Sequence, residues 1–167
     1  MSFLPTIFAD MESGPAVWIR IEGKGTFQNS PGLKDFSRRM IDGGRRAFVV
    51  DLQHCPAMDS TFMGTLAGLA LRLREVGGGD LWVVNRNDRN ADLLEGLGLD
   101  ALFSECPAPK MNGGGGDAIT HTADKAATRE VMREAHEACV EANPENEARF
   151  RDVLDYLGAS AAKDAAN

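Results

Sequence analysis

Short runs of apolar residues with a two-residue period predict the strands of a sheet. Residues 16–23 (AVWIRIEG) alternate between apolar and polar side chains, which is typical of a half-buried strand, and we expect it to be antiparallel. Residues 47–52 (AFVVDL) and 81–84 (LWVV) are continuous apolar runs of the kind found in the interior of a sheet. We expect one further edge strand at residues 101–104.

Segments with helical spacing separate these strands. Residues 30–41 begin with Ser-Pro, which favours a helix start, and two glycines follow them. Residues 61–76 carry an apolar side chain at every third or fourth position and end at three glycines. A shorter helix is expected at residues 90–97, closed by Gly98. The alternation predicts an α/β fold with a mixed, mostly parallel sheet covered by helices.

The C-terminal third differs from this body in charge and in pattern. Residues 1–111 hold 12 basic and 14 acidic side chains, whereas residues 112–167 hold 6 and 11. Four consecutive glycines mark the change, and such a run does not hold a regular element without cost. We expect three parts: a folded domain at 1–111, a glycine-rich linker at 112–119 and an acidic helical extension at 120–167.

The extension reads as a helical hairpin. Residues 123–142 have a thin stripe of small apolar side chains, and Asn143-Pro144-Glu145 then opens a second helix whose apolar positions include Phe150 and Leu157. The hairpin either covers a face of its own domain or binds something else. Residues 159–167 are expected to form a frayed tail.

Net charge and the length of the apolar runs argue against several classes of function. The net charge of −7 argues against nonspecific binding to nucleic acid or anionic lipid, which needs excess Lys and Arg. No apolar run approaches the roughly 20 residues of a membrane span, and the N-terminus does not read as a signal peptide. We therefore expect a cytoplasmic protein that is not inserted into a membrane. The three cysteines are widely spaced and are expected to be reduced thiols, mostly buried.

The candidate chemistry lies where residues 47–52 lead into the helix at 61–76. Asp59-Ser60-Thr61 offers three short side chains that can accept hydrogen bonds from a first helical turn, and the sequence leaves open whether Asp59 or Ser60 is the cap. Ser60 is either only part of a cap or a hydroxyl placed where helix amides could hold a phosphate. No residue pattern indicates a catalytic group, a metal site or a cofactor.

The segment M-D-S-T-F-M-G-T-L at residues 58–66, within this order of strands and helices, resembles a STAS domain of the anti-sigma factor antagonist type. The resemblance covers residues 16–105. In that family a D-S-[ST]-G segment opens the second helix, and a partner kinase phosphorylates the serine after the aspartate. The resemblance implies that Ser60 is the phosphoacceptor and that Gly64 lets a partner approach the helix closely. Phe62 stands where the family has its glycine, and its ring either packs under the sheet or forms part of an exposed contact surface.

The function implied is a phosphorylation-regulated protein-binding switch without enzymatic activity. Its partner would be an anti-sigma factor that is also a serine protein kinase, bound while Ser60 is unphosphorylated. A phosphate would add about −1.5 to −2 charges and weaken the contact. The expected partner-binding residues surround Ser60: Met58, Asp59, Thr61, Phe62, Met63 and Gly64. The alternatives are a scaffold module, with a possible homodimer, and an accessory role beside a transport system.

Overall fold

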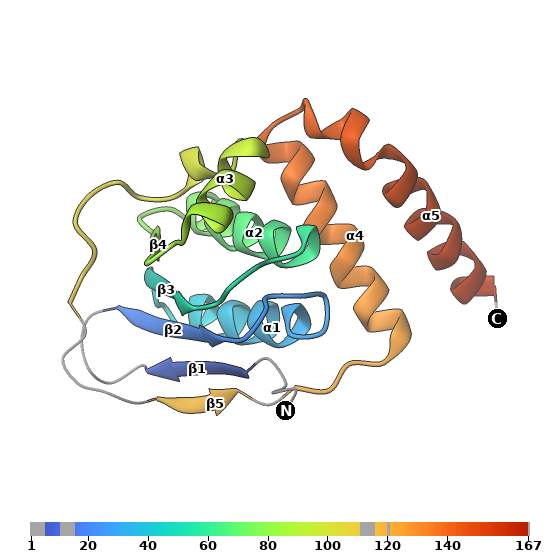
Figure 1. Ribbon diagram of the computed structural model, residues 1–167. Helices are drawn as coiled ribbons and strands as arrows, with labels where there is room; N and C mark the ends of the chain where they lie inside the picture. Colours follow the sequence, from blue (N-terminus) through green and yellow to red (C-terminus); the bar gives the residue numbers. More distant parts are fainter. Residues whose placement is uncertain (1–5, 11–15, 111–115, 120, 167) are drawn as a thin grey trace.

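The computed structural model describes residues 6–10, 16–110, 116–119 and 121–166 and shows a sheet with layers of helices on one face (Figure 1). Helices α1 and α2 pack directly on the sheet, α4 crosses over them, and α5 forms the outermost layer. The elements in chain order are β1 Thr6–Asp10, β2 Val17–Glu22, α1 Ser30–Asp42, β3 Ala47–His54, α2 Ser60–Val76, β4 Asp80–Val84, α3 Asp88–Gly96, the 3₁₀ turn η1 Asp100–Leu102, β5 Asp117–Ile119, α4 Lys125–Ala142 and α5 Asn146–Ala166.

The five strands of the described residues form one mixed sheet in the order β4-β3-β2-β1-β5. Strands β2, β3 and β4 are parallel to one another, whereas β1 pairs antiparallel with both β2 and β5. The predicted α/β class and the C-terminal helices are confirmed. The strand predicted at residues 16–23 pairs in both senses, because it lies between the antiparallel β1 and the parallel β3.

The core lies between the sheet and the first layer of helices. Val17, Ile19 and Ile21 of β2 are fully buried, as their alternation predicts, and side chains from β3 and α2 complete the layer. Burying such side chains contributes about 1.5–3 kcal/mol each relative to exposure. In the described part of the chain, the residues predicted to be buried from the apolar pattern of β2 therefore lie in the core.

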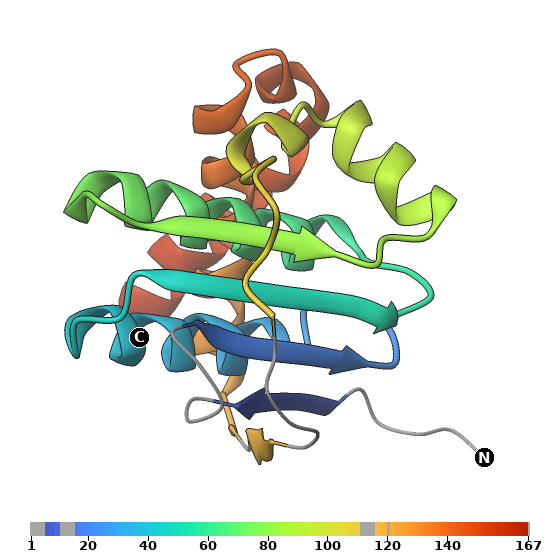
Figure 2. The same ribbon diagram turned by 90° about the vertical axis from the view of Figure 1, so that its left-hand side faces the viewer.

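The chain segment after η1 crosses the opposite face of the sheet (Figure 2). The indole nitrogen of Trp82 donates to the carbonyl of Cys106 at 2.9 Å, and the backbone nitrogen of Ser104 donates to Leu81 at 2.8 Å. The edge strand predicted at residues 101–104 is wrong, because residues 100–102 form a 3₁₀ turn and a single backbone hydrogen bond, from Ser104 to Leu81, joins this described segment to β4.

Two strands at the other edge of the sheet were not predicted. β1 is five residues long, and its buried Ile7 and Ala9 alternate with half-buried positions. β5 lies inside the segment predicted as a linker, because its backbone completes the free edge of β1. The division into a domain, a linker and an extension stays a prediction. Helix α5 runs to Ala166, where a frayed tail was expected.

The structure leaves no space for a side chain at Gly25, which gives the first prediction. A Cβ atom at Gly25 would lie 2.5 Å from Cδ1 of the fully buried Phe62 ring. We expect Gly25→Ala to lower the free energy of unfolding by about 1–3 kcal/mol, measured by urea denaturation, because the ring must shift within a packed core. Gly96→Ala is the matched control, since nothing lies within 4 Å of its Cβ position. Equal stabilities of the two variants would contradict this account.

Candidate functional site

Asp59 organises the start of helix α2. One carboxylate oxygen accepts a hydrogen bond from the backbone nitrogen of Phe62 at 2.8 Å, which settles Asp59 as the N-cap. The other oxygen accepts from the backbone nitrogen of Phe27, also at 2.8 Å. One side chain therefore fixes both the first turn of α2 and the loop between β2 and α1.

Backbone contacts hold the same two loops together. The nitrogen of Gly25 donates to the carbonyl of Ala57, and the nitrogen of Asp59 donates to the carbonyl of Gly25, at 3.0 and 2.9 Å. Gly25 and Met58 form an isolated parallel bridge. The backbone directly before Ser60 is thus tied to the loop that contains Gly25.

Ser60 is the first residue of α2, and its half-buried hydroxyl faces a histidine of α4. The distance from Oγ of Ser60 to Nε2 of His136 is 2.9 Å, and Nδ1 of His136 lies 2.6 Å from the carbonyl oxygen of Met132. Because a carbonyl only accepts, Nδ1 carries the proton that is donated to Met132, and in this tautomer Nε2 is the acceptor. The hydroxyl of Ser60 is therefore the donor to His136.

His136 is a site residue that the sequence analysis missed. It is 2 % exposed, and its ring packs edge-on against Phe150 of α5, with centroids 4.8 Å apart. Seventy-six positions separate it from Ser60, and no local motif links the two residues. Position 136 lies within the helix predicted for residues 123–142, but the apolar stripe predicted for that helix did not include His136.

Helix α4 approaches α2 with backbone contact. A Cβ atom at Gly64 would lie 2.5 Å from the carbonyl carbon of Ala135 and 2.9 Å from its Cα, so only glycine fits there. Gly68, one turn further along α2, faces the side chain of Ala138 at van der Waals distance. The buried face of α4 is made of side chains that are mostly small: Val131, Ala135, His136, Ala138 and Cys139.

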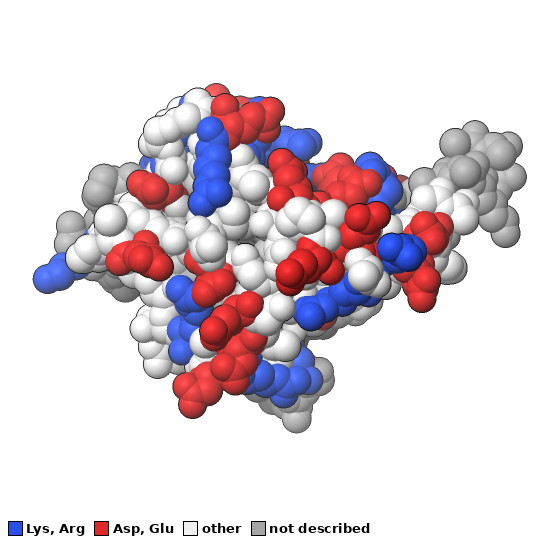
Figure 3. Space-filling view, turned by 90° about the horizontal axis from the view of Figure 1, so that it is seen from above, with Lys and Arg blue, Asp and Glu red and all other residues white. Residues whose placement is uncertain are grey.

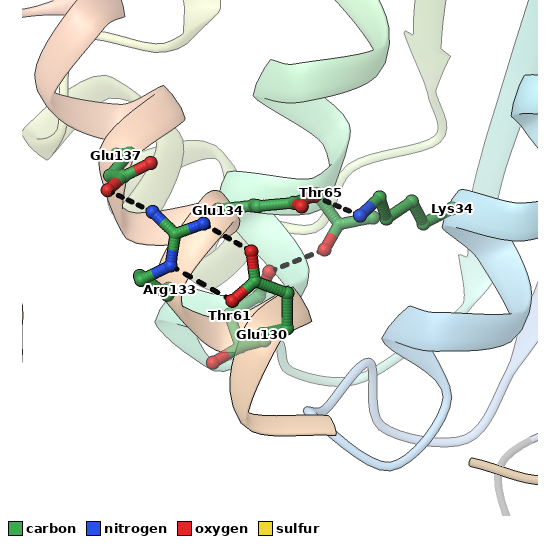
Figure 4. A network of polar contacts seen from close by, with 7 residues as sticks. All are labelled: Lys34, Thr61, Thr65, Glu130, Arg133, Glu134 and Glu137. Atoms are coloured by element: carbon green, nitrogen blue, oxygen red, sulfur yellow. Dashed lines mark hydrogen bonds and ion pairs between the residues drawn. The ribbon is translucent and has the colours of Figure 1, made fainter. Parts of the chain in front are cut away.

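Ion pairs flank this contact, as Figure 4 shows. Lys34 of α1 pairs with Glu134 of α4, which ties α4 to the first layer of helices. Arg133 is bonded to Glu130 and Glu137 of its own helix. The hydrogen bond from Arg133 lowers the pKa of Glu130 below its ordinary value, and the same bond raises the pKa of Arg133.

The predicted contact residues are less exposed than a free docking surface would be. Phe62 is fully buried in the core, which is one of the two placements left open for its ring, and the ring packs above Gly25. Its expected place among the partner-binding residues is therefore corrected. Met58, Thr61 and Met63 are also buried, and Gly64 lies directly under α4. Asp59 and Ser60 are half-buried.

Other features of the described residues give no sign of a second chemical site. A groove of about 370 Å³ lies between α1, α2 and α4, and its lining residues include neither Ser60 nor His136. Within the described ranges, no group of three His, Cys, Asp or Glu side chains is placed to hold a metal ion. No helix of the described chain has the length and apolarity to span a membrane. Figure 3 shows acidic and basic side chains interspersed on the face it presents.

The chain belongs to the STAS domain family, since the model of that family matches residues 9–111. The fold is similar to that in "NMR Structure of the protein TM1081", with a TM-score of 0.52 and 16 % identity over 57 % of this chain and 75 % of that one. It is also similar to the phosphorylated form of the Bacillus cell fate determinant SpoIIAA, with a TM-score of 0.50 and 18 % identity over 59 % and 88 % of the two chains. No curated protein matches the sequence.

The double role of Asp59 gives the second prediction. Asp59→Ala removes the acceptors of both the Phe62 and the Phe27 backbone nitrogens. We expect a loss of about 1–3 kcal/mol in the free energy of unfolding, because an N-cap is lost and a second donor is left unpaired. Asp59→Asn keeps one acceptor oxygen, so its free energy of unfolding should fall by less than that of Asp59→Ala. Two-state urea unfolding measures both values, and an Asp59→Ala protein as stable as wild type would refute the assigned role.

Cys139 gives a prediction about pH. Burial raises the pKa of its thiol from 9.0 to about 12. The folded chain therefore keeps a proton that the unfolded chain loses near pH 9, so this stabilisation is complete below pH 9 and is lost as the pH rises toward 12.

We expect the free energy of unfolding to fall by about 1.4 kcal/mol per pH unit above pH 9 from this group alone. The free energy of unfolding of wild type and of Cys139→Ala is measured at pH 8 and at pH 10. The contributions of the other titrating groups cancel in the difference between the two proteins. A stability difference that is the same at both pH values would show that the thiol does not titrate in this way.

Proposed function

We propose that this STAS domain is a protein-binding switch of the anti-sigma factor antagonist type, controlled by phosphorylation of Ser60. Its partner is an anti-sigma factor that is also a serine protein kinase, and it binds the chain while Ser60 carries a free hydroxyl. The chain acts in this proposal by binding and not by catalysis.

The placement of Ser60 is the observation that carries the proposal. Its hydroxyl is half-buried at the first residue of α2, directly after a cap that is already satisfied by Asp59. A phosphate there lies at the positive end of the helix dipole. Because Asp59 holds the first turn and the neighbouring loop, the added charge need not unfold the domain.

The added charge changes what the surface can bind. A phosphate carries about −1.5 to −2 charges and three acceptor oxygens, and desolvating it in an interface is costly. Asp59 already places a carboxylate beside it. Phosphorylation therefore weakens association while the fold persists, which is the behaviour of a switch.

The fourth prediction tests this function. The full chain is incubated with ATP and each anti-sigma type serine kinase of its own source, and the phosphate is located by mass spectrometry. We expect phosphate on Ser60, its loss in Ser60→Ala and its retention in Thr61→Val, because the Thr61 side chain is buried.

Partner affinity provides the second half of that test. Ser60→Asp should bind the kinase at least about tenfold more weakly than Ser60→Ala, which corresponds to about 1.4 kcal/mol. Equal affinity of the two variants contradicts the switch. An unphosphorylated Ser60 in every incubation favours the alternative function, a scaffold module in which Ser60 only follows the cap.

A further inference from the structure

Helix α4 lies on the part of α2 that the proposed function assigns to a partner. The closest approach to Gly64, expected from a partner, is made by the backbone of Ala135 in the same chain. The hydroxyl of Ser60, expected to receive a phosphate, donates to His136 of the same helix. Both features of the expected site are thus occupied by one segment.

The docked α4 excludes a second helix or loop from this position. Two backbones cannot share the space above Gly64, because even a single Cβ atom there would overlap the Ala135 peptide. A kinase must also reach Oγ of Ser60, and His136 lies 2.9 Å from that atom and is itself buried. Phosphoryl transfer to Ser60 therefore requires α4 to move.

The contact between α4 and α2 is close and is made mostly by small side chains of α4. Three of the five buried residues of α4 are Ala135, Ala138 and Cys139, and small side chains bury little apolar area. The contacts of α4 with the STAS body also include the hydrogen bond between Ser60 and His136 and the partly exposed Lys34–Glu134 ion pair. Surface pairs of that kind contribute little to stability.

A buried amide anchors the turn between α4 and α5. The side-chain nitrogen of Asn146 donates to the carbonyls of Leu97 and Cys139, both at 2.9 Å, and Asn146 is buried. The side chain of Asn143 packs against Gly98 in the same region. The hairpin can thus swing away from α2 only when this anchor opens.

We propose that α4 is an intramolecular competitor for the partner-binding face of α2, so that the kinase must displace the α4–α5 hairpin before it binds the chain or phosphorylates Ser60. The inference rests on the proposed function. It adds that the resting chain is autoinhibited, and that the partner presents a helix or loop with small side chains opposite Gly64.

The native cysteines report the movement of α4 without a partner. Cys139 lies on the covered face of α4, Cys55 is buried within the STAS body, and Cys106 is exposed. Release of α4 exposes Cys139 and removes the burial that keeps its thiol protonated. The cysteines are labelled with iodoacetamide at pH 8, and the labelling rates are measured by mass spectrometry. Labelling of Cys139 alone reports local release of α4, whereas labelling of both Cys139 and Cys55 reports global unfolding.

The fifth prediction uses a variant that disturbs α4 and leaves α2 unchanged. Ala135→Glu places a charge at the buried contact with Gly64, whereas Ala126→Glu places the same charge at an exposed position of α4 and is the control. We expect Cys139 to be labelled at least about tenfold faster in Ala135→Glu than in Ala126→Glu, with Cys55 labelled at an unchanged rate.

Access to position 60 is measured in the same way. In a Ser60→Cys protein, we expect Ala135→Glu to raise the labelling rate of residue 60 at least about tenfold. The kinase identified by phosphate on Ser60 should bind Ala135→Glu more tightly than Ala126→Glu and phosphorylate it faster, by a similar factor.

The outcomes separate the two proposals. Faster labelling of Cys139 and of residue 60, with kinase binding and phosphorylation unchanged, overturns the competition while the proposed function stands. Absence of phosphate on Ser60 even in Ala135→Glu overturns both. If Ala135→Glu also exposes Cys55, the test uses Asn146→Ala instead, which opens the anchor of the hairpin. This variant should raise the labelling rates of Cys139 and of residue 60 by the same factor. Unchanged labelling rates in Asn146→Ala overturn the inference.

Discussion

The site depends on one contact, the backbone-to-backbone approach of α4 to α2 at Gly64. A side chain at this position would push the two helices apart, and the distance between Ser60 and His136 would grow with them. The contact therefore sets where His136 stands, what the hydroxyl of Ser60 bonds to and how much of α2 is covered. The extension that looked like an appendage is part of the architecture of the site.

Beneath that contact, Asp59 keeps the first turn of α2 in place whether or not α4 is docked. Its two acceptor bonds run to α2 and to the loop before α1, and neither involves the C-terminal hairpin. The site thus consists of a fixed part, built by the STAS body, and a covering part, built by α4. This arrangement separates the stability of the body from the availability of its binding face.

Most of the body could be predicted from the sequence because its signals are local. The alternation in β2, the apolar run of β3 and the spacing in α2 report burial directly, and the capping segment placed Ser60 at the helix start. The choice between Asp59 and Ser60 as cap needed coordinates, since either side chain can accept from the same turn. The choice between a packed and an exposed Phe62 also needed the structure, because the space that receives its ring is made by Gly25, a residue of a distant loop.

The rest of the site could not be predicted because it depends on long-range pairing. His136 meets Ser60 across 76 positions, and the chain between them crosses the open face of the sheet before it turns back (Figure 2). Nothing in the spacing of the stripe on α4 says which surface it will cover. β5 could not be predicted for the same reason, because its three residues form a strand only by pairing with the free edge of β1.

That short strand has a consequence for the behaviour of the protein in solution. Without it, β1 would be the terminal strand and would offer unpaired amide and carbonyl groups, which is the geometry through which sheets from separate molecules join. β5 occupies part of this edge along Ile7, Phe8 and Ala9, and the Ser104 bond to Leu81 does so at one position of the opposite edge. The path that delivers the hairpin to α2 thus replaces the five-residue β1 with a three-residue strand at one margin of the sheet, and a short edge strand offers little template for pairing with another molecule.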